Sequence, residues 1–177
     1  MITIDEPGIL TQAPDFENPL GLIQACHERI LFHCDLLDKL TDYIARNEID
    51  KEASDAGRRI HRYFNTAGKL HHQDEEKDLF PRLVRVSLKL ADIINQLKQG
   101  HQQLDRLWES IVPSLSNLYK LDKNTLAQFS EQCHEFSALN RQHLEFEEEE
   151  LLSIARHLIS SDDMLLIGKS MRERRGL

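Results

Sequence analysis

The chain has 177 residues, of which 40% are hydrophobic and 29% charged, with only 7 glycines and 5 prolines. This length fits a single domain, and the composition favours long helices over a turn-rich sheet. The net charge of -8 without a basic stripe argues against nucleic-acid binding, and the absence of an apolar run of about 18 residues argues against a membrane span. The three cysteines lack C-x-x-C spacing and no signal peptide is recognisable, so we expect a cytoplasmic protein without disulfides.

The amino-terminal half contains two predicted helices. Residues 1–18 carry prolines and little periodicity, which predicts an extended arm. From Leu20 the apolar residues recur at helical spacing, and His27 lies in the same stripe. A second helix is predicted from about Lys51 to about Pro81, because proline cannot continue a helix interior.

The carboxyl-terminal half repeats this organisation. A short helical link leads into a third helix, where Pro113 can introduce a kink, and a fourth helix is predicted from about Asn124, a suitable N-cap residue. Four long amphipathic helices with short links predict an all-α, antiparallel up-down four-helix bundle over residues 19–160. Residues 161–177 are predicted to form a short helix and tail.

The chain also contains an internal repeat. Residues 71–79 and 143–151 share a histidine, two glutamates and a leucine at equal spacing, and the helices that carry His27 and His101 repeat more loosely. The chain is therefore approximately two helical hairpins in tandem. In an antiparallel bundle, such a repeat can bring two H-x-x-x-E pairs face to face.

Each of the four helices places one histidine in its apolar stripe, and two of them add a glutamate one turn later. The i, i+4 spacing puts each histidine and glutamate on one helix face. A carboxylate has two oxygens and can bridge two ions, whereas an imidazole supplies one nitrogen. Cations would also remove the penalty of burying ionised carboxylates. We therefore predict a two-metal site of iron, manganese or zinc with these ligands: His27, His71, Glu75, His101, His143 and Glu147.

Several alternatives stay open. A lone histidine in a helical stripe is more often a hydrogen-bonded core residue than a ligand, although six groups in register favour a metal. Asp105 lies one turn after a predicted ligand and is either a further ligand, a hydrogen-bond acceptor behind the ligands or a solvated carboxylate. A register that uses His72 and Glu76 is the weaker choice because it continues a more polar face. We interpret Glu148 as solvated and Cys26 as a packing residue.

The segment HHQDEEKDLFP, residues 71–81, resembles the H-x-x-x-E-E-x-x-L-F-P segment of hemerythrin-like, HHE cation-binding domains of a bacterial subgroup. The resemblance spans about residues 19–158. It implies a four-helix bundle around two iron ions (Fe2+/Fe3+), held by the six residues named above. It further implies a small ligand such as dioxygen, peroxide or nitric oxide, and a use in oxygen or redox sensing, iron storage or repair of damaged iron centres.

This chain departs from oxygen-carrying hemerythrins at two positions. Those proteins have a histidine where this chain has Asp105, and their last carboxylate is an aspartate five residues after its histidine, where this chain has Glu147. A site with fewer imidazoles and more carboxylates favours the higher oxidation state, which argues against reversible oxygen carriage. We expect a binding or sensing protein rather than an enzyme. The alternatives are a carboxylate-bridged di-iron enzyme, such as a peroxidase, a ferroxidase or an iron-centre repair protein, and a purely structural bundle.

Overall fold

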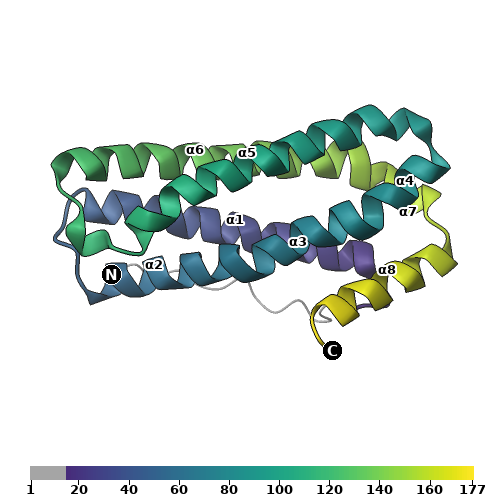
Figure 1. Ribbon diagram of the computed structural model, residues 1–177, viewed down its shortest axis with the longest axis horizontal. Helices are drawn as coiled ribbons and strands as arrows, with labels where there is room; N and C mark the ends of the chain where they lie inside the picture. Colours follow the sequence, from purple (N-terminus) through teal and green to yellow (C-terminus); the bar gives the residue numbers. More distant parts are fainter. Residues whose placement is uncertain (1–14) are drawn as a thin grey trace.

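The structure is a computed structural model that describes residues 15–177. Four long helical segments run antiparallel along one axis (Figure 1). The predicted all-α, up-down four-helix bundle is confirmed, and the described residues contain no strand. The first and third segments are α1 (Pro19–Ile44) and α5 (Ala91–Leu115). The second and fourth are α2 (Lys51–Tyr63), η1 (Phe64–Gly68), α3 (Lys69–Asp74), η2 (Glu75–Leu79) and α4 (Phe80–Val86), and then α6 (Lys123–Glu147), η5 (Glu148–Leu152) and α7 (Ser153–Leu158).

Side-chain caps define where the first and last of these segments begin. The Asn18 side chain accepts a hydrogen bond from the backbone N–H of Gly21 and so starts α1. At α6 the prediction that Asn124 caps the helix is wrong. Asp122 is the N-cap instead, because its carboxylate accepts hydrogen bonds from the backbone N–H groups of Asn124 and Thr125, forming a capping box with Thr125.

The second segment does not stop near Pro81, as the sequence predicted, but continues to Val86. Three stretches of the bundle are π-helical, and one of them, η2, ends two residues before this proline. In η2 the Phe80 N–H donates to the carbonyl of Glu75, five residues back. The π turn therefore places Pro81 at the start of a new helical stretch, where its missing N–H is tolerated.

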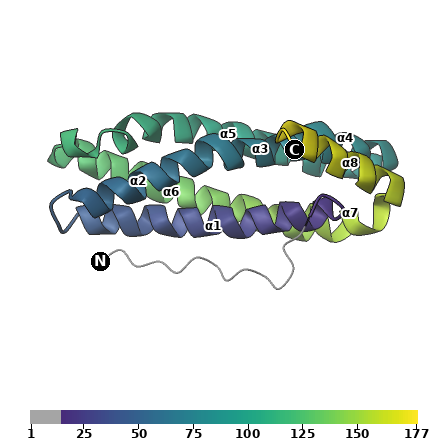
Figure 2. The ribbon, with the colours of Figure 1, turned by 90° about the horizontal axis from the view of Figure 1, so that it is seen from below.

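Short connections and a final helix complete the fold. The 3-10 turns η3 (Leu88–Leu90) and η4 (Leu118–Lys120) lie on either side of α5, which contains Pro113. Helix α8 (Ser161–Arg174) folds back and packs against α1, α3 and η2 (Figures 1 and 2). The predicted arm lies outside the described residues except for residues 15–18, which form a turn before α1.

Arginines at the end of α8 hold it against the second segment. The Arg174 guanidinium donates hydrogen bonds to the carboxylates of Asp74 and Asp78, and Arg175 donates to Asp74 with an Nη2–Oδ2 distance of 2.6 Å. Both aspartates are buried. The arginines therefore supply the opposite charge that buried carboxylates require.

The apolar core is divided into two clusters. One surrounds fully buried side chains such as Leu37, Ile111 and Phe129, and the other surrounds Ile23 and Leu79. A layer of buried polar side chains lies between them and receives residues from all four segments. None of the helices in the described part of the chain combines the length and apolarity needed to span a bilayer.

Candidate metal centre

The six residues predicted as metal ligands meet in the polar layer between the two apolar clusters. None of them is more than 8% exposed. Each segment contributes at least one, so the layer crosses the whole bundle. The contributors are His27 from α1, His71 from α3, Glu75 from η2, His101 from α5, and His143 and Glu147 from α6.

Glu75 lies at the centre of this cluster. Its Oε1 is 3.0 Å from Nε2 of His71 and 3.7 Å from Nε2 of His27, and its Oε2 is 3.3 Å from Nε2 of His101. The two oxygens of one carboxylate thus face imidazoles from different hairpins. This is the arrangement in which a carboxylate can bridge two cations.

Glu147 occupies the repeat-related position. Its Oε2 is 3.5 Å from Nε2 of His27 and 4.0 Å from Nε2 of His143. The imidazoles form two pairs: the rings of His27 and His71 lie 4.9 Å apart, and those of His101 and His143 lie 4.7 Å apart. Each pair comes from one hairpin, and carboxylates from both hairpins lie between the pairs.

The cluster contains polar atoms that the protein itself does not satisfy. Among the described residues, nine buried side-chain nitrogen and oxygen atoms have no hydrogen-bond partner, and all nine belong to these six residues. Buried polar atoms are normally paired, because an unpaired one loses its water without compensation. Ligand atoms of His27, His71, Glu75 and Glu147 also lie within 4.8 Å of one another. Imidazole and carboxylate donors converging in this way fit a metal ion.

Two further glutamates orient the imidazoles from behind. Nδ1 of His101 donates to Glu76 over 2.7 Å, and Nδ1 of His27 donates to Glu148 over 2.7 Å, leaving each Nε2 directed at the cluster. Our interpretation of Glu148 as solvated is wrong, since it also accepts a hydrogen bond from Gln24 at 2.9 Å. The signal was present in the sequence: a second glutamate follows each H-x-x-x-E pair.

The alternative ligands lie outside the cluster. The His72 ring stacks on the His101 ring, with centroids 3.9 Å apart and planes inclined by 12°. Asp105 lies 3.8 Å from Nδ1 of His72, and its side chain is 60% exposed. The structure therefore brings together the register that contains His71, and places His72 and Asp105 beside it.

The carboxylates favour protonation of three imidazoles. Burial alone would lower their pKa values, but the surrounding glutamates outweigh it and raise the pKa of His27 to about 12, of His71 to about 10 and of His101 to about 9. The same contacts, against the effect of burial, hold the pKa of Glu75 well below its usual range. Without a metal ion, protons thus balance part of the negative charge.

The pKa values of His143 and Glu147 are shifted in the opposite directions to those of His71 and Glu75. Burial and the charge of His101 lower the pKa of His143 to about 3, so this imidazole is neutral. Burial and the charge of Glu75 raise the pKa of Glu147. A neutral imidazole is the form that binds a metal ion, so His143 needs no proton loss before ligation.

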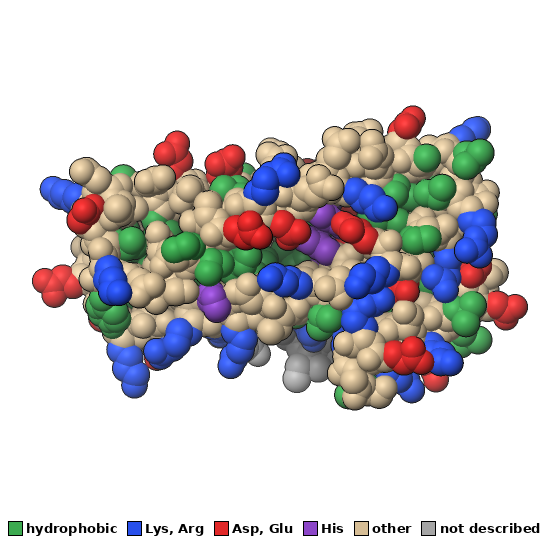
Figure 3. All heavy atoms as spheres, in the orientation of Figure 1, with side chains coloured by type: hydrophobic (Ala, Val, Ile, Leu, Met, Phe, Trp, Pro, Cys, Tyr) green, Lys and Arg blue, Asp and Glu red, His purple; other side chains and the backbone are tan. Residues whose placement is uncertain are grey.

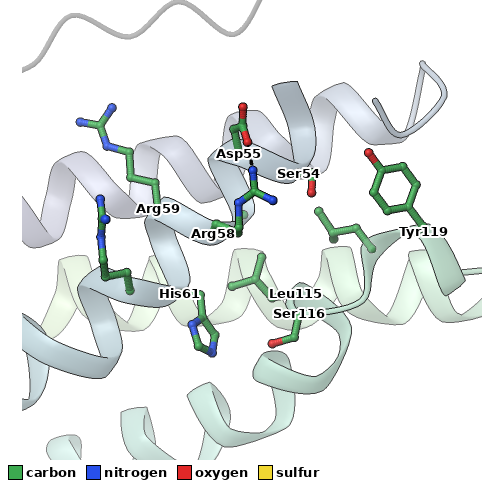
Figure 4. A pocket seen from close by; sticks show the side chains of 11 residues that line it. Ser54, Asp55, Arg58, Arg59, His61, Leu115, Ser116 and Tyr119 are labelled. Carbon is green, nitrogen blue, oxygen red and sulfur yellow. Dashed lines mark hydrogen bonds and ion pairs between the residues drawn. The ribbon is translucent and has the colours of Figure 1, made fainter. Parts of the chain in front are cut away.

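A surface hollow lies apart from the cluster and contains none of the six clustered residues. It measures about 590 Å³ and runs between α2 and the end of α5. Arg58 pairs there with Asp55, while Arg59 points away from His61 and Ser116 (Figure 4). These cations do not converge on one point, so the hollow lacks the geometry of an anion site.

Comparison with known proteins relates this chain to a protein family and to an individual protein. The family described as Hemerythrin HHE cation binding domain matches residues 18–155, a range that includes all six clustered residues. A protein of Haemophilus influenzae (strain ATCC 51907 / DSM 11121 / KW20 / Rd), described as an uncharacterized protein, is 30% identical over 169 residues. That alignment covers 93% of this chain and 94% of the relative.

Proposed function

This chain belongs to the hemerythrin HHE cation-binding domain family and is a metal-binding protein, and from that premise we propose that it holds a non-haem di-iron centre for a small ligand. The observation that carries the proposal is the set of nine unpartnered buried atoms on six residues. Eight of these atoms are the Nε2 atoms of the four histidines and the four oxygens of Glu75 and Glu147, and cations would satisfy donors that converge in this way.

The two halves of the cluster suggest two metal positions. His27 and His71 would hold one ion, His101 and His143 would hold the other, and Glu75 and Glu147 would be shared by both. Iron bound there would supply redox chemistry and a coordination position for a small molecule. The same donors suit manganese or zinc, so metal analysis must identify the ion.

The proposed ligand is dioxygen, peroxide or nitric oxide, and the proposed use is sensing or iron handling. Support comes from the surroundings, since apolar side chains cover the cluster on both sides and exclude bulk water and larger substrates. A binding role needs only this enclosure and an open coordination position.

A carboxylate-bridged di-iron enzyme is the second candidate. The observation that favours it is the number of carboxylates, because Glu76 and Glu148 add negative charge behind the imidazoles. An anionic donor set stabilises the oxidised metal and so favours irreversible oxidation. Exposing the reduced, iron-loaded protein to oxygen and then to vacuum separates the two: an absorption change that reverses supports binding, and continued peroxide consumption supports catalysis.

Metal content tests the proposal directly. Protein purified from iron-replete cells should contain two ions per chain, and the variant His143→Ala should lose at least one of them. His157→Ala is the matched control because His157 is an exposed histidine of α7 outside the cluster. Absence of metal from both the parent protein and the control would reject the di-iron centre.

A further inference from the structure

A small void lies one helical turn from the metal cluster. It measures about 30 Å³ and is lined by aliphatic and aromatic side chains together with four polar or charged ones, those of Lys69, His72, Asp105 and Asn140. Ile30 and Leu104 each follow a clustered histidine by three positions, and Asn140 precedes one by three. Because α1 and α5 run opposite to α6, all three offsets point toward the same end of the bundle. The void is therefore the layer next to the cluster.

The layer on the other side of the cluster is filled. Four aliphatic side chains, each at most 1% exposed, occupy it: Ile23, Leu79, Leu97 and Leu151. Each lies four positions from a clustered residue, which again equals one helical turn. A molecule that reaches the cluster along the bundle axis must come from the side of the void.

A surface groove shares a wall with the void. It measures about 490 Å³, lies between α3 and α5, and has Lys69, His72, Asp105 and Trp108 in common with the void. Figure 3 shows acidic, basic and histidine side chains together midway along the molecule, and the groove is lined by side chains of all three kinds. The shared residues are thus the constriction between solvent and the interior.

Two ring systems form this constriction. The His72 ring is held against the His101 ring. The Trp108 ring packs against Phe64, with centroids 5.0 Å apart, and its indole N–H donates to Oδ1 of Asn65 over 3.4 Å. The His72 side chain lies in the wall that the groove and the void share, so its removal would widen the passage.

We propose that the groove and the void form the access route and docking pocket for a small uncharged ligand of the metal centre, with His72 and Trp108 as its constriction. This inference rests on the proposed function. A volume of about 30 Å³ is roughly the space of one water molecule, so it admits only a molecule of very few atoms. An ion would lose part of its hydration against the aliphatic and aromatic walls of the void. The groove that leads to it carries three carboxylates, of Glu76, Asp105 and Glu109, against two lysines, Lys69 and Lys77, so its net charge does not attract anions.

Gly68 offers a way to narrow the void without damage. A Cβ added there would lie 3.4 Å from Cδ1 of Phe64 and 3.8 Å from the carbonyl oxygen of Tyr63, which are ordinary contacts. Gly68→Ala therefore adds a methyl group to the wall of the void. Gly57→Ala is the matched control, because Gly57 lies earlier in the same segment, away from the void, and its added Cβ would meet the end of the Leu118 side chain at 3.2 Å.

The protein contains an intrinsic fluorescent probe of the proposed access route. Trp108 is its single tryptophan, is 5% exposed and lines both the groove and the void. We would measure the fluorescence lifetime of the full-length protein, metal-free and zinc-loaded, with dissolved oxygen as the uncharged quencher and iodide as the anionic one. Neither form contains iron, so the measurement does not depend on di-iron chemistry.

Oxygen should quench Trp108 and iodide should do so far less. Gly68→Ala should lower the oxygen quenching constant about twofold and His72→Ala should raise it about twofold, since close-packed interiors restrict even small molecules. Gly57→Ala should match the parent protein. Equal oxygen quenching in Gly68→Ala and Gly57→Ala, or iodide quenching as efficient as oxygen quenching, would overturn the route. If His72→Ala does not fold, the comparison of Gly68→Ala with Gly57→Ala still tests the route. Failure to bind iron would reject the di-iron centre and leave this readout intact.

Discussion

Glu148 accepts a hydrogen bond from Nδ1 of His27, and Glu148 is the first residue of the π turn that comes after a clustered glutamate. Likewise Glu76, the residue after Glu75, accepts a hydrogen bond from Nδ1 of His101. Each H-x-x-x-E-E segment thus places its first glutamate in the cluster and uses its second to orient an imidazole from another helix. Two imidazoles of the cluster, those of His27 and His101, are therefore held by carboxylates that contact their Nδ1 atoms from outside the cluster.

Replacing the orienting glutamates should therefore weaken metal binding. We expect Glu148→Gln and Glu76→Gln each to lower metal affinity by about 10- to 100-fold, because the imidazole loses its charged acceptor and its fixed orientation. Competition with a chelator of known affinity measures this. Asp105→Asn is the control, since Asp105 lies at the groove and not in the cluster. Equal affinities in all three variants would contradict the assigned role.

Gly100 should be required for the second metal position. A Cβ added at Gly100 would lie 2.6 Å from Nδ1 of His143, so Gly100→Ala must displace that ring. We expect the variant to keep the ion near His27 and His71 and to lose the other, lowering the metal content from two ions to one. Elemental analysis beside Gly57→Ala checks this, and a full complement of metal in Gly100→Ala would count against it.

Helix α8 should contribute to stability through its arginines. Arg174→Ala leaves Asp78 without a cation and Asp74 with Arg175 alone. Breaking a buried ion pair is strongly destabilising, so we expect the free energy of unfolding to fall by about 3 kcal/mol. Lys169→Ala, which removes an exposed pair with Glu173, should change it by less than about 1 kcal/mol. Chemical denaturation compares the two, and similar values would refute the clamp.

Stability should respond to pH differently with and without metal. The pKa values of His27, His71 and His101 are raised from 6.5 to about 12, 10 and 9, so their stabilising effect in the metal-free protein is complete below pH 6.5 and declines as the pH rises above it. A metal ion displaces these protons, so the apparent affinity of the protein for metal rises as the pH increases over the same range. The Tm of the metal-free protein should therefore fall between pH 6.5 and 9, and the increase in Tm on adding zinc should grow. If the increase in Tm on adding zinc does not change with pH, these protons are not displaced.

The sequence predicted the bundle and the convergence of the six residues because both depend on helical periodicity. Four apolar stripes, each with one histidine, define which faces meet, and the repeat of H-x-x-x-E selects His71 over His72. Such reasoning assumes regular helices. A π turn inserts one residue and rotates the side chains beyond it, which is why the continuation past Pro81 and the inward position of Glu148 were missed.

Ion pairs between residues far apart in the chain also could not be predicted from the sequence. Aspartates are mostly exposed in proteins, but Asp74 and Asp78 are buried, and Arg174 and Arg175, about a hundred positions later, supply their opposite charges. At α6, Asn124 and Asp122 are both suitable caps by residue type. Only the backbone geometry decides that Asp122 accepts the hydrogen bonds.

The division of the imidazoles between the two hairpins bears on how the molecule is assembled. Each hairpin supplies both imidazoles of one pair, and a carboxylate of the opposite hairpin lies next to that pair. Ions held there would tie the two halves of the polypeptide to each other, as a covalent cross-link does. A chain cleaved in the connection between α4 and α5 would then yield two hairpin fragments whose reassociation depends on metal supply.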